Sequence, residues 1–237
     1  MLSWLYPITC RVCGEVSERC LCADCLAAMP QLPTPICLYC GASVGGNLQD
    51  AYHCAACKAK PRPFDVARSA LLANDATMPL IHELKYQRAI YLAAAFAPAL
   101  LQVWQAHPEF RTFEKSAAIV PVPINRTHLY TRGYNQAEEL ARSLSRLVGV
   151  PVVQPLLRQE TAAHSQTGLS AAQRLQNAYA AYHPLPAYAS GKKKLPPHLV
   201  LVDDVYTTGA TVRACAAALK RLPGIRKIAV LTLLRVP

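Results

Sequence analysis

Eight cysteines arranged as four C-x-x-C pairs within the first 57 residues constrain the fold of this chain more than any other feature. A C-x-x-C pair on a tight turn directs both sulfurs at one tetrahedral ion, and two pairs complete the four-thiolate site that is usual for structural zinc. Four pairs therefore predict two zinc ions. The predicted ligands are Cys10, Cys13, Cys22, Cys25, Cys37, Cys40, Cys54 and Cys57.

The spacing leaves the grouping of the pairs open. Sequential grouping, with the first four cysteines in one site and the last four in the other, keeps the loops short and is the arrangement that we expect. Interleaved grouping fits the spacing as well. A disulfide framework is the alternative to zinc, but it needs an oxidising compartment. Cys20 is either a free thiol or a competitor of Cys22, and Cys215 lies in an apolar helical stretch typical of a core.

The cysteine-rich segment and the rest of the chain differ in charge. Residues 1–62 hold five Lys or Arg and four Asp or Glu, whereas residues 63–237 hold twenty and ten. A basic surface favours polyanions such as nucleic acid or phosphorylated metabolites, and an ordinary solvated basic surface is the alternative. We predict a metal-dependent ribbon domain at 1–60 and a larger domain at 65–237, joined by the proline-containing linker KAKPRPFD.

The longest mainly apolar stretch, residues 89–104, is too short to span a membrane, which takes about 20 residues. We read it as a buried or amphipathic helix, broken or kinked at Pro98. The opening MLSWLYPITC has no basic stretch before its apolar residues, unlike an export signal. The sequence therefore predicts no membrane insertion and a cytoplasmic location.

Beyond residue 62, short aliphatic runs alternate with helical patterns, which predicts an α/β fold with a parallel sheet flanked by helices. Expected strands are 66–73, 117–123, 198–204 and 227–235, and expected helices are 78–86, 91–105, 133–149, 170–181 and 210–221. Residues 158–177 are polar with little strand signal. Residues 184–197, PLPAYASGKKKLPP, read as an exposed loop.

Two adjacent carboxylates, Asp203 and Asp204, follow the aliphatic run in the stretch LVLVDDVYTTGATV. Like charges repel, so a cation or a set of hydroxyls is expected beside them, and ligands of open α/β sheets bind where strands end. The following TTGAT opens a helix whose free N–H groups can hold a phosphate, and Gly209 permits close backbone approach. The carboxylates suit a sugar diol or a magnesium ion. Two solvated aspartates at an exposed strand end are the alternative.

This stretch resembles the signature of type I phosphoribosyltransferases, which bind 5-phosphoribosyl-1-pyrophosphate (PRPP). The resemblance implies that Asp203 and Asp204 are the catalytic acidic pair and contact the ribose hydroxyls. It also implies that the loop holds the 5′-phosphate through Thr207, Thr208, Gly209, Ala210 and Thr211. Together with the cysteine pairs, the chain resembles the ComF family, including its GntX-like members, in which a double zinc ribbon precedes a phosphoribosyltransferase domain.

Other stretches extend this resemblance: PVP (121–123), RGYNQAEELA (132–141), and Arg158, Thr161, Gln166, Leu169, Arg174 and Asn177. Arg132 suits pyrophosphate binding, with a surface arginine as the alternative. PVP is either a loop on the pyrophosphate side or a strand terminator. Residues 158–177 fall where the family has a mobile flap, with local packing as the alternative. Lys85-Tyr86 matches a pair common in the family, without a role that we can derive.

The resemblance implies two structural zinc ions, magnesium with PRPP, and a role in DNA uptake or in the use of external DNA in bacteria. The implied partners are PRPP or a nucleotide phosphate, single-stranded DNA and other proteins of DNA uptake. Enzymes that act on 6-oxopurines carry an aspartate base where this chain has Thr207, and orotate-type enzymes rely on a flap lysine that residues 160–175 lack. The sequence thus favours a binding protein, with an active magnesium-dependent phosphoribosyltransferase of unidentified acceptor as the alternative.

Overall fold

The structure is a computed structural model of the 237-residue chain. It describes residues 7–44, 52–59, 63–112, 116–153, 155–160 and 179–237. The region 161–178 of the expected flap, with most of the helix expected at 170–181, lies outside the described residues, as do Thr161, Gln166, Leu169, Arg174 and Asn177.

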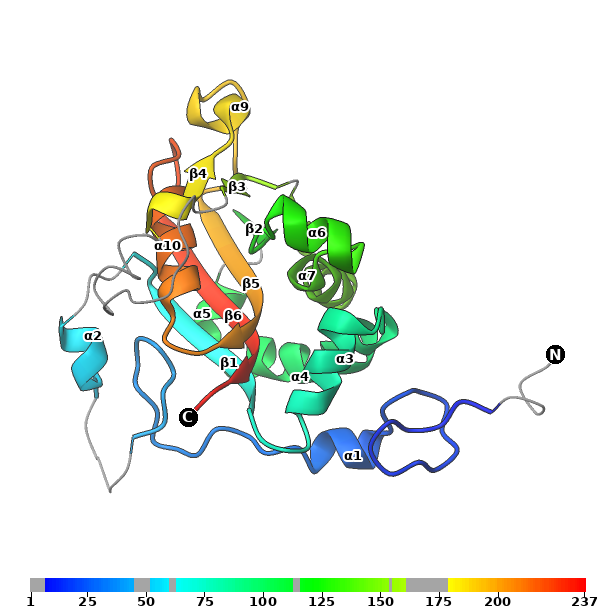
Figure 1. Cartoon of the computed structure of the whole chain (residues 1–237). Coiled ribbons are helices and arrows are strands. Elements are labelled where there is room, and N and C mark those ends of the chain that lie inside the picture. The colour runs from blue at the N-terminus through cyan, green and yellow to red at the C-terminus, as the bar shows by residue number, and fades with distance from the viewer. Residues whose placement is uncertain (1–6, 45–51, 60–62, 113–115, 154, 161–178) are drawn as a thin grey trace, which may run out of the picture.

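Four parallel strands in the order β1-β6-β5-β2 form the central sheet (Figure 1). Their bounds are β1 Val66–Leu72, β2 Ala117–Pro121, β5 His198–Tyr206 and β6 Lys227–Arg235. The register pairs Val66 with Ala229 and Asp203 with Thr232. The predicted parallel sheet flanked by helices is therefore confirmed, and all four expected strands are present.

Helices cover both faces of the sheet because β5 and β6 are apolar on both sides. Val200 and Val202 face the core that contains helices α4 (Tyr91–Ala106) and α7 (Gln136–Val148). The alternate residues of the same strand, Leu199 and Leu201, belong to the core on the other face, beneath helix α10 (Ala210–Leu219). The side chains of these four residues of β5 are fully buried.

The remaining described elements are short or peripheral to the sheet. They are α1 Ala23–Ala27, α2 Ala55–Ala59, α3 Met78–Tyr86, α5 Pro108–Arg111, α6 Arg126–Arg132, α9 Pro186–Ala189, and the antiparallel pair β3 Leu157–Gln159 and β4 Tyr182–Pro184. Among the described residues, no helix is both long and apolar enough to cross a membrane.

Several local expectations are wrong. Helix α4 is not broken at Pro98. An interior proline costs about 3 kcal/mol, and burial of large side chains such as Phe96, Leu100 and Trp104 contributes more, at about 1.5–3 kcal/mol each. The supposed loop 184–197 contains the short helix α9, and the supposedly strand-poor segment begins with β3. Strand β5 also extends two residues beyond its expected end at Asp204, to Tyr206.

The cysteine-rich segment packs on both faces of the sheet. Cys10, Leu21 and Met29 of its first half join the core beneath α4. In its second half, Tyr39 stacks on Phe64 with ring centroids 4.7 Å apart, and the Tyr39 carbonyl accepts a 2.7 Å hydrogen bond from the Ala67 N–H. The domain boundary at 60–65 stays a prediction.

Candidate functional site

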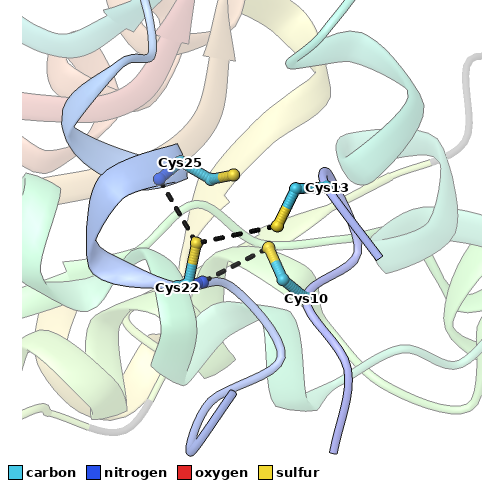
Figure 2. A group of neighbouring side chains, drawn as sticks. All are labelled: Cys10, Cys13, Cys22 and Cys25. Carbon is cyan, nitrogen blue, oxygen red and sulfur yellow. Dashed lines mark hydrogen bonds between the residues drawn. The ribbon is translucent and has the colours of Figure 1, made fainter. Parts of the chain in front are cut away.

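The first cysteine cluster consists of Cys10, Cys13, Cys22 and Cys25, whose sulfurs lie within 4.8 Å of one another (Figure 2). The Sγ atoms of Cys13 and Cys22 are 4.0 Å apart. Backbone N–H groups point at the sulfurs: Cys22 donates to Cys10 Sγ and Cys25 donates to Cys22 Sγ, both at 3.4 Å. Such N–H donors stabilise thiolates, the form that binds zinc.

The second cluster consists of Cys37, Cys40, Cys54 and Cys57, again with all sulfurs within 4.8 Å. The Cys54 N–H donates to Cys37 Sγ at 3.4 Å. Burial raises the pKa of the Cys37 thiol, but N–H donors from Cys40, Cys54 and Tyr39 outweigh it and lower the pKa to about 6. The sequential grouping is therefore the one that the structure brings together.

Buried arginines surround the second cluster. Arg213 donates to Cys57 Sγ at 3.6 Å, and Arg235 contacts Cys40 through both its sulfur at 3.8 Å and its carbonyl at 2.8 Å. Zn²⁺ bound by four thiolates carries a net charge of about −2, which these cations offset in a region shielded from water. Both clusters thus fit a zinc ion. Cys20 lies outside them, and Cys215 is buried in the core as predicted.

A pocket of about 380 Å³ lies at the carboxyl end of β5. It gathers side chains from segments far apart in the sequence: Lys85, Val122, Pro123, Arg132, Asn135, Gln136, Gln159, Tyr182, Asp203, Asp204, Thr207 and Thr211 are among its lining residues. Of the predicted phosphate loop, Thr207 and Thr211 line the pocket, and the turn of Thr208, Gly209 and Ala210 connects them. The acid pair, the TTGAT turn, the PVP loop and the RGYN segment therefore meet in one place.

The acid pair at the pocket is buried and forms an ion pair with a lysine of the same chain. Asp203 is 8% exposed and Asp204 5% exposed. Lys85 Nζ, from α3, lies 2.9 Å from Asp204 Oδ2, while the Asp204 N–H donates to Asp203 Oδ1 at 2.9 Å. Burial, followed by the Asp204 charge, raises the pKa of Asp203 well above its usual range. The charged form of Asp203 is thus disfavoured, and Lys85 neutralises its neighbour.

Arg132 and the PVP loop also line the pocket. The Arg132 guanidinium lies over the Tyr86 ring, 4.9 Å from its centroid, and donates to Gln136 Oε1 at 3.2 Å. Its buried Nε has no hydrogen-bond partner among the described residues. Asn135 Nδ2 donates to the Val122 carbonyl at 2.9 Å, which ties the RGYN segment to the PVP loop.

The turn that begins α10 depends on glycine. Gly209 is the N-cap of α10 in the left-handed conformation, with φ 73°, and has no side chain to cap the helix. The first amide of α10 already has a partner, because the Ala210 N–H donates to Thr208 Oγ1 at 3.4 Å. A Cβ at Gly209 would lie 2.5 Å from Tyr206 Cζ and closer still to its hydroxyl oxygen. The Arg235 guanidinium lies over the same Tyr206 ring, 4.4 Å from its centroid. Arg235 therefore connects the second cysteine cluster to the turn through Tyr206.

Comparison with known proteins decides the family. A model described as a double zinc ribbon domain matches residues 1–58. "Competence protein F" of Haemophilus influenzae is 30% identical over 232 residues, which cover 96% of each chain. The chain belongs to the ComF family. "DNA utilization protein YhgH" of Salmonella typhi is 31% identical over 224 residues, covering 93% of this chain and 91% of that protein. "Competence protein ComFC" of Streptococcus pneumoniae is 25% identical over 197 residues, or 82% and 79%.

Sequence reasoning about this ComF-family chain left some pocket residues without a role. Lys85 and Tyr86 were noted only as a matching pair, and the structure has them against Asp204 and Arg132 respectively. Tyr182 lines the pocket from β4, and no sequence motif predicts its presence there. Its position depends on the pairing of β4 with β3, a long-range contact that no local pattern encodes.

Proposed function

We propose that this ComF-family protein binds PRPP, or the 5′-phosphate end of a nucleotide, in the pocket at the carboxyl end of β5. The observation that carries the proposal is the meeting of the acid pair, the TTGAT turn and Arg132 in one cavity. Each group matches one part of PRPP. The first-turn amides of α10 suit the 5′-phosphate, the acid pair suits the ribose hydroxyls, and Arg132 suits the pyrophosphate.

The charges of the pocket support an anionic ligand. Two cations, Lys85 and Arg132, line it, whereas burial and the neighbouring Asp204 charge raise the pKa of Asp203 and so disfavour its charged form. Lys85 already neutralises Asp204, so Arg132 is left to attract the ligand. Its unpartnered Nε is a further donor inside the cavity wall.

Magnesium is expected to bind in this pocket together with the ligand and not in its absence. Mg²⁺ prefers carboxylates together with substrate phosphates. Lys85 pairs with one oxygen of Asp204, and burial raises the pKa of Asp203, which disfavours its charged form. The acid pair alone is therefore a poor site for the metal, and magnesium is expected to be carried in by the pyrophosphate oxygens.

Binding is better supported than turnover. Thr207 stands at the pocket where 6-oxopurine enzymes have an aspartate base, and a hydroxyl cannot accept a ring proton at neutral pH. The relatives named for competence and for DNA utilization extend the proposal to a role in DNA uptake or in the use of external DNA. In that role the pocket senses or holds a phosphorylated ribose instead of consuming it.

Calorimetric titration of PRPP, with and without magnesium, tests this function. The double variant Asp203→Asn with Asp204→Asn should lose about 100-fold in affinity, because hydrogen bonds to charged groups contribute about 1.5–3 kcal/mol each. Asp65→Asn is the matched control, since Asp65 accepts a 2.8 Å hydrogen bond from the Ile228 N–H near the other end of the sheet. Unchanged affinity in the double variant, or no binding by the wild-type protein, would refute the proposal. Release of pyrophosphate would instead assign turnover.

A further inference from the structure

We infer that the opposite end of the sheet carries a second site, a surface that binds the phosphate backbone of single-stranded DNA. This inference rests on the proposed role in DNA uptake and locates the contact with DNA away from the pocket. We call this surface the basic end. It consists of Lys192, Lys193, Lys194, Lys220, Arg221, Arg226 and Lys227, all exposed.

The basic end is built from two separate segments that the fold holds together. One follows α9, and the other joins the end of α10 to the start of β6. The Arg226 N–H donates to the Pro197 carbonyl at 2.8 Å, and Lys220 Nζ donates to the Arg226 carbonyl at 2.8 Å. Gly191 and Pro223 also approach closely, since a Cβ at Gly191 would lie 3.6 Å from Pro223 Cγ. Two basic runs thus form one continuous surface.

The charge of the basic end is almost unopposed. Residues 186–197 and 219–227 contain seven Lys or Arg and no Asp or Glu. Of the described acidic side chains, Asp65 is the one that forms an ion pair with this surface, 3.6 Å from Lys220 Nζ. The neighbouring His198 is affected by these positive charges: its pKa is lowered by burial and then by the charges of Lys227 and Arg226.

The distribution of these cations fits a single strand better than a small anion or a duplex. A small anion needs donors that converge in a cavity, whereas these side chains are spread over an exposed surface. Proteins that read duplex DNA usually insert a helix or a β-ribbon into a groove, but these cations lie on turns and at element ends. Lys193 lies over the half-buried Tyr188 ring, 5.6 Å from its centroid, so an aromatic face accompanies the charge.

The basic end and the pocket lie at opposite ends of β5. His198 begins the strand beside the basic end, and Asp203 and Asp204 lie near its other terminus. At about 3.3 Å per residue, the five steps of β5 from His198 to Asp203 correspond to about 17 Å. In Figure 1, α9 lies at the top of the view and the C-terminus lies in its lower part. DNA at the basic end therefore leaves the end of the pocket at the acid pair open, although Arg221 donates to the carbonyl of the pocket residue Tyr182 at 3.2 Å.

Fluorescence anisotropy with a labelled oligo(dT) strand, measured over a range of salt concentrations, tests the inference on the full-length protein. The variants are Lys192→Gln with Lys194→Gln in one segment, and Arg226→Gln with Lys227→Gln in the other. The matched control, Arg19→Gln with Arg88→Gln, removes the same charge from exposed positions on other elements. Each basic-end variant should lower the slope of log K against log salt by about 1.4, which is about 25-fold in affinity at 0.1 M salt.

Several outcomes would overturn the inference. They are a wild-type protein that does not bind the strand, basic-end variants that behave like the control, or loss of DNA binding in the Asp203→Asn, Asp204→Asn variant. Titration of PRPP keeps this test separate from the proposed function. The basic-end variants should bind PRPP with wild-type affinity, which also demonstrates that they are folded, and PRPP binding can fail while DNA binding persists.

Discussion

The turn before α10 gives the sharpest mutational test, because two separate constraints, the backbone conformation and the space for a side chain, favour glycine at position 209. Its φ of 73° is left-handed, which costs a residue with a Cβ about 1–2 kcal/mol. A Cβ there would also collide with the Tyr206 ring. That ring is 3% exposed, and the Arg235 guanidinium lies 4.4 Å from its centroid, so the ring has little room to retreat. Such overpacking adds about 1–3 kcal/mol.

The matched control is Gly149→Ala. Gly149 has φ 71°, but no atom lies within 4 Å of a Cβ built there, so this variant carries the backbone cost alone. For a chain of this size, about 1 kcal/mol corresponds to about 2–4 °C in Tm. Gly209→Ala should therefore melt about 2–12 °C below Gly149→Ala. Displacement of the turn should also weaken PRPP at least about 10-fold, the value of one or two lost phosphate hydrogen bonds.

Differential scanning fluorimetry and calorimetric titration with PRPP measure both effects. Equal melting temperatures for the two glycine variants, together with PRPP affinities within about twofold of wild type, would refute the reasoning. In that case Tyr206 would not hold the turn, and the amides of α10 would not receive the phosphate.

Three further predictions concern the acid pair and the metal. Lys85→Gln removes the cation beside Asp204 and should lower the free energy of unfolding by about 1–3 kcal/mol. Magnesium alone should then raise the Tm of the variant but not of the wild type. Equal magnesium responses would contradict this role of Lys85. The pKa of Asp203 is raised in the folded protein, so above pH 3.8, its usual pKa, the folded protein binds more protons than the unfolded chain. The free energy of unfolding should therefore fall as the pH rises from 3.8 towards the raised pKa. Asp203→Asn should flatten this decline and be more stable at pH 7, and a less stable variant with the same slope would argue against a protonated Asp203. A chelator should release about two zinc ions per chain and unfold the cysteine-rich segment, as followed by a colorimetric zinc assay and circular dichroism; metal-free protein prepared under reducing conditions that keeps its fold would contradict the zinc sites.

Local patterns predicted the frame of this fold well. Aliphatic runs gave β1, β2, β5 and β6, because a strand buried on both faces must be apolar throughout. The four C-x-x-C pairs predicted two cysteine clusters, because metal coordination fixes both ligand type and spacing. These features depend on neighbours in the sequence, and so a sequence reveals them.

Features that depend on distant contacts were missed. Strands β3 and β4 have three residues each and exist through their pairing with one another. The ion pair of Lys85 with Asp204 joins residues 119 positions apart, so the charge state of the acid pair could not be derived from the sequence. The pattern placed Asp203 and Asp204 at the end of the strand, but it could not show that both carboxylates are buried, because their burial depends on the elements packed around them.

A crystal structure of the protein soaked with PRPP and magnesium tests the central claim most directly. The account predicts density for the 5′-phosphate at the first-turn amides of α10, with ribose hydroxyls against Asp203 and Asp204 and pyrophosphate near Arg132. Density for PRPP at another place on the protein, with the acid pair still closed against Lys85, would contradict it.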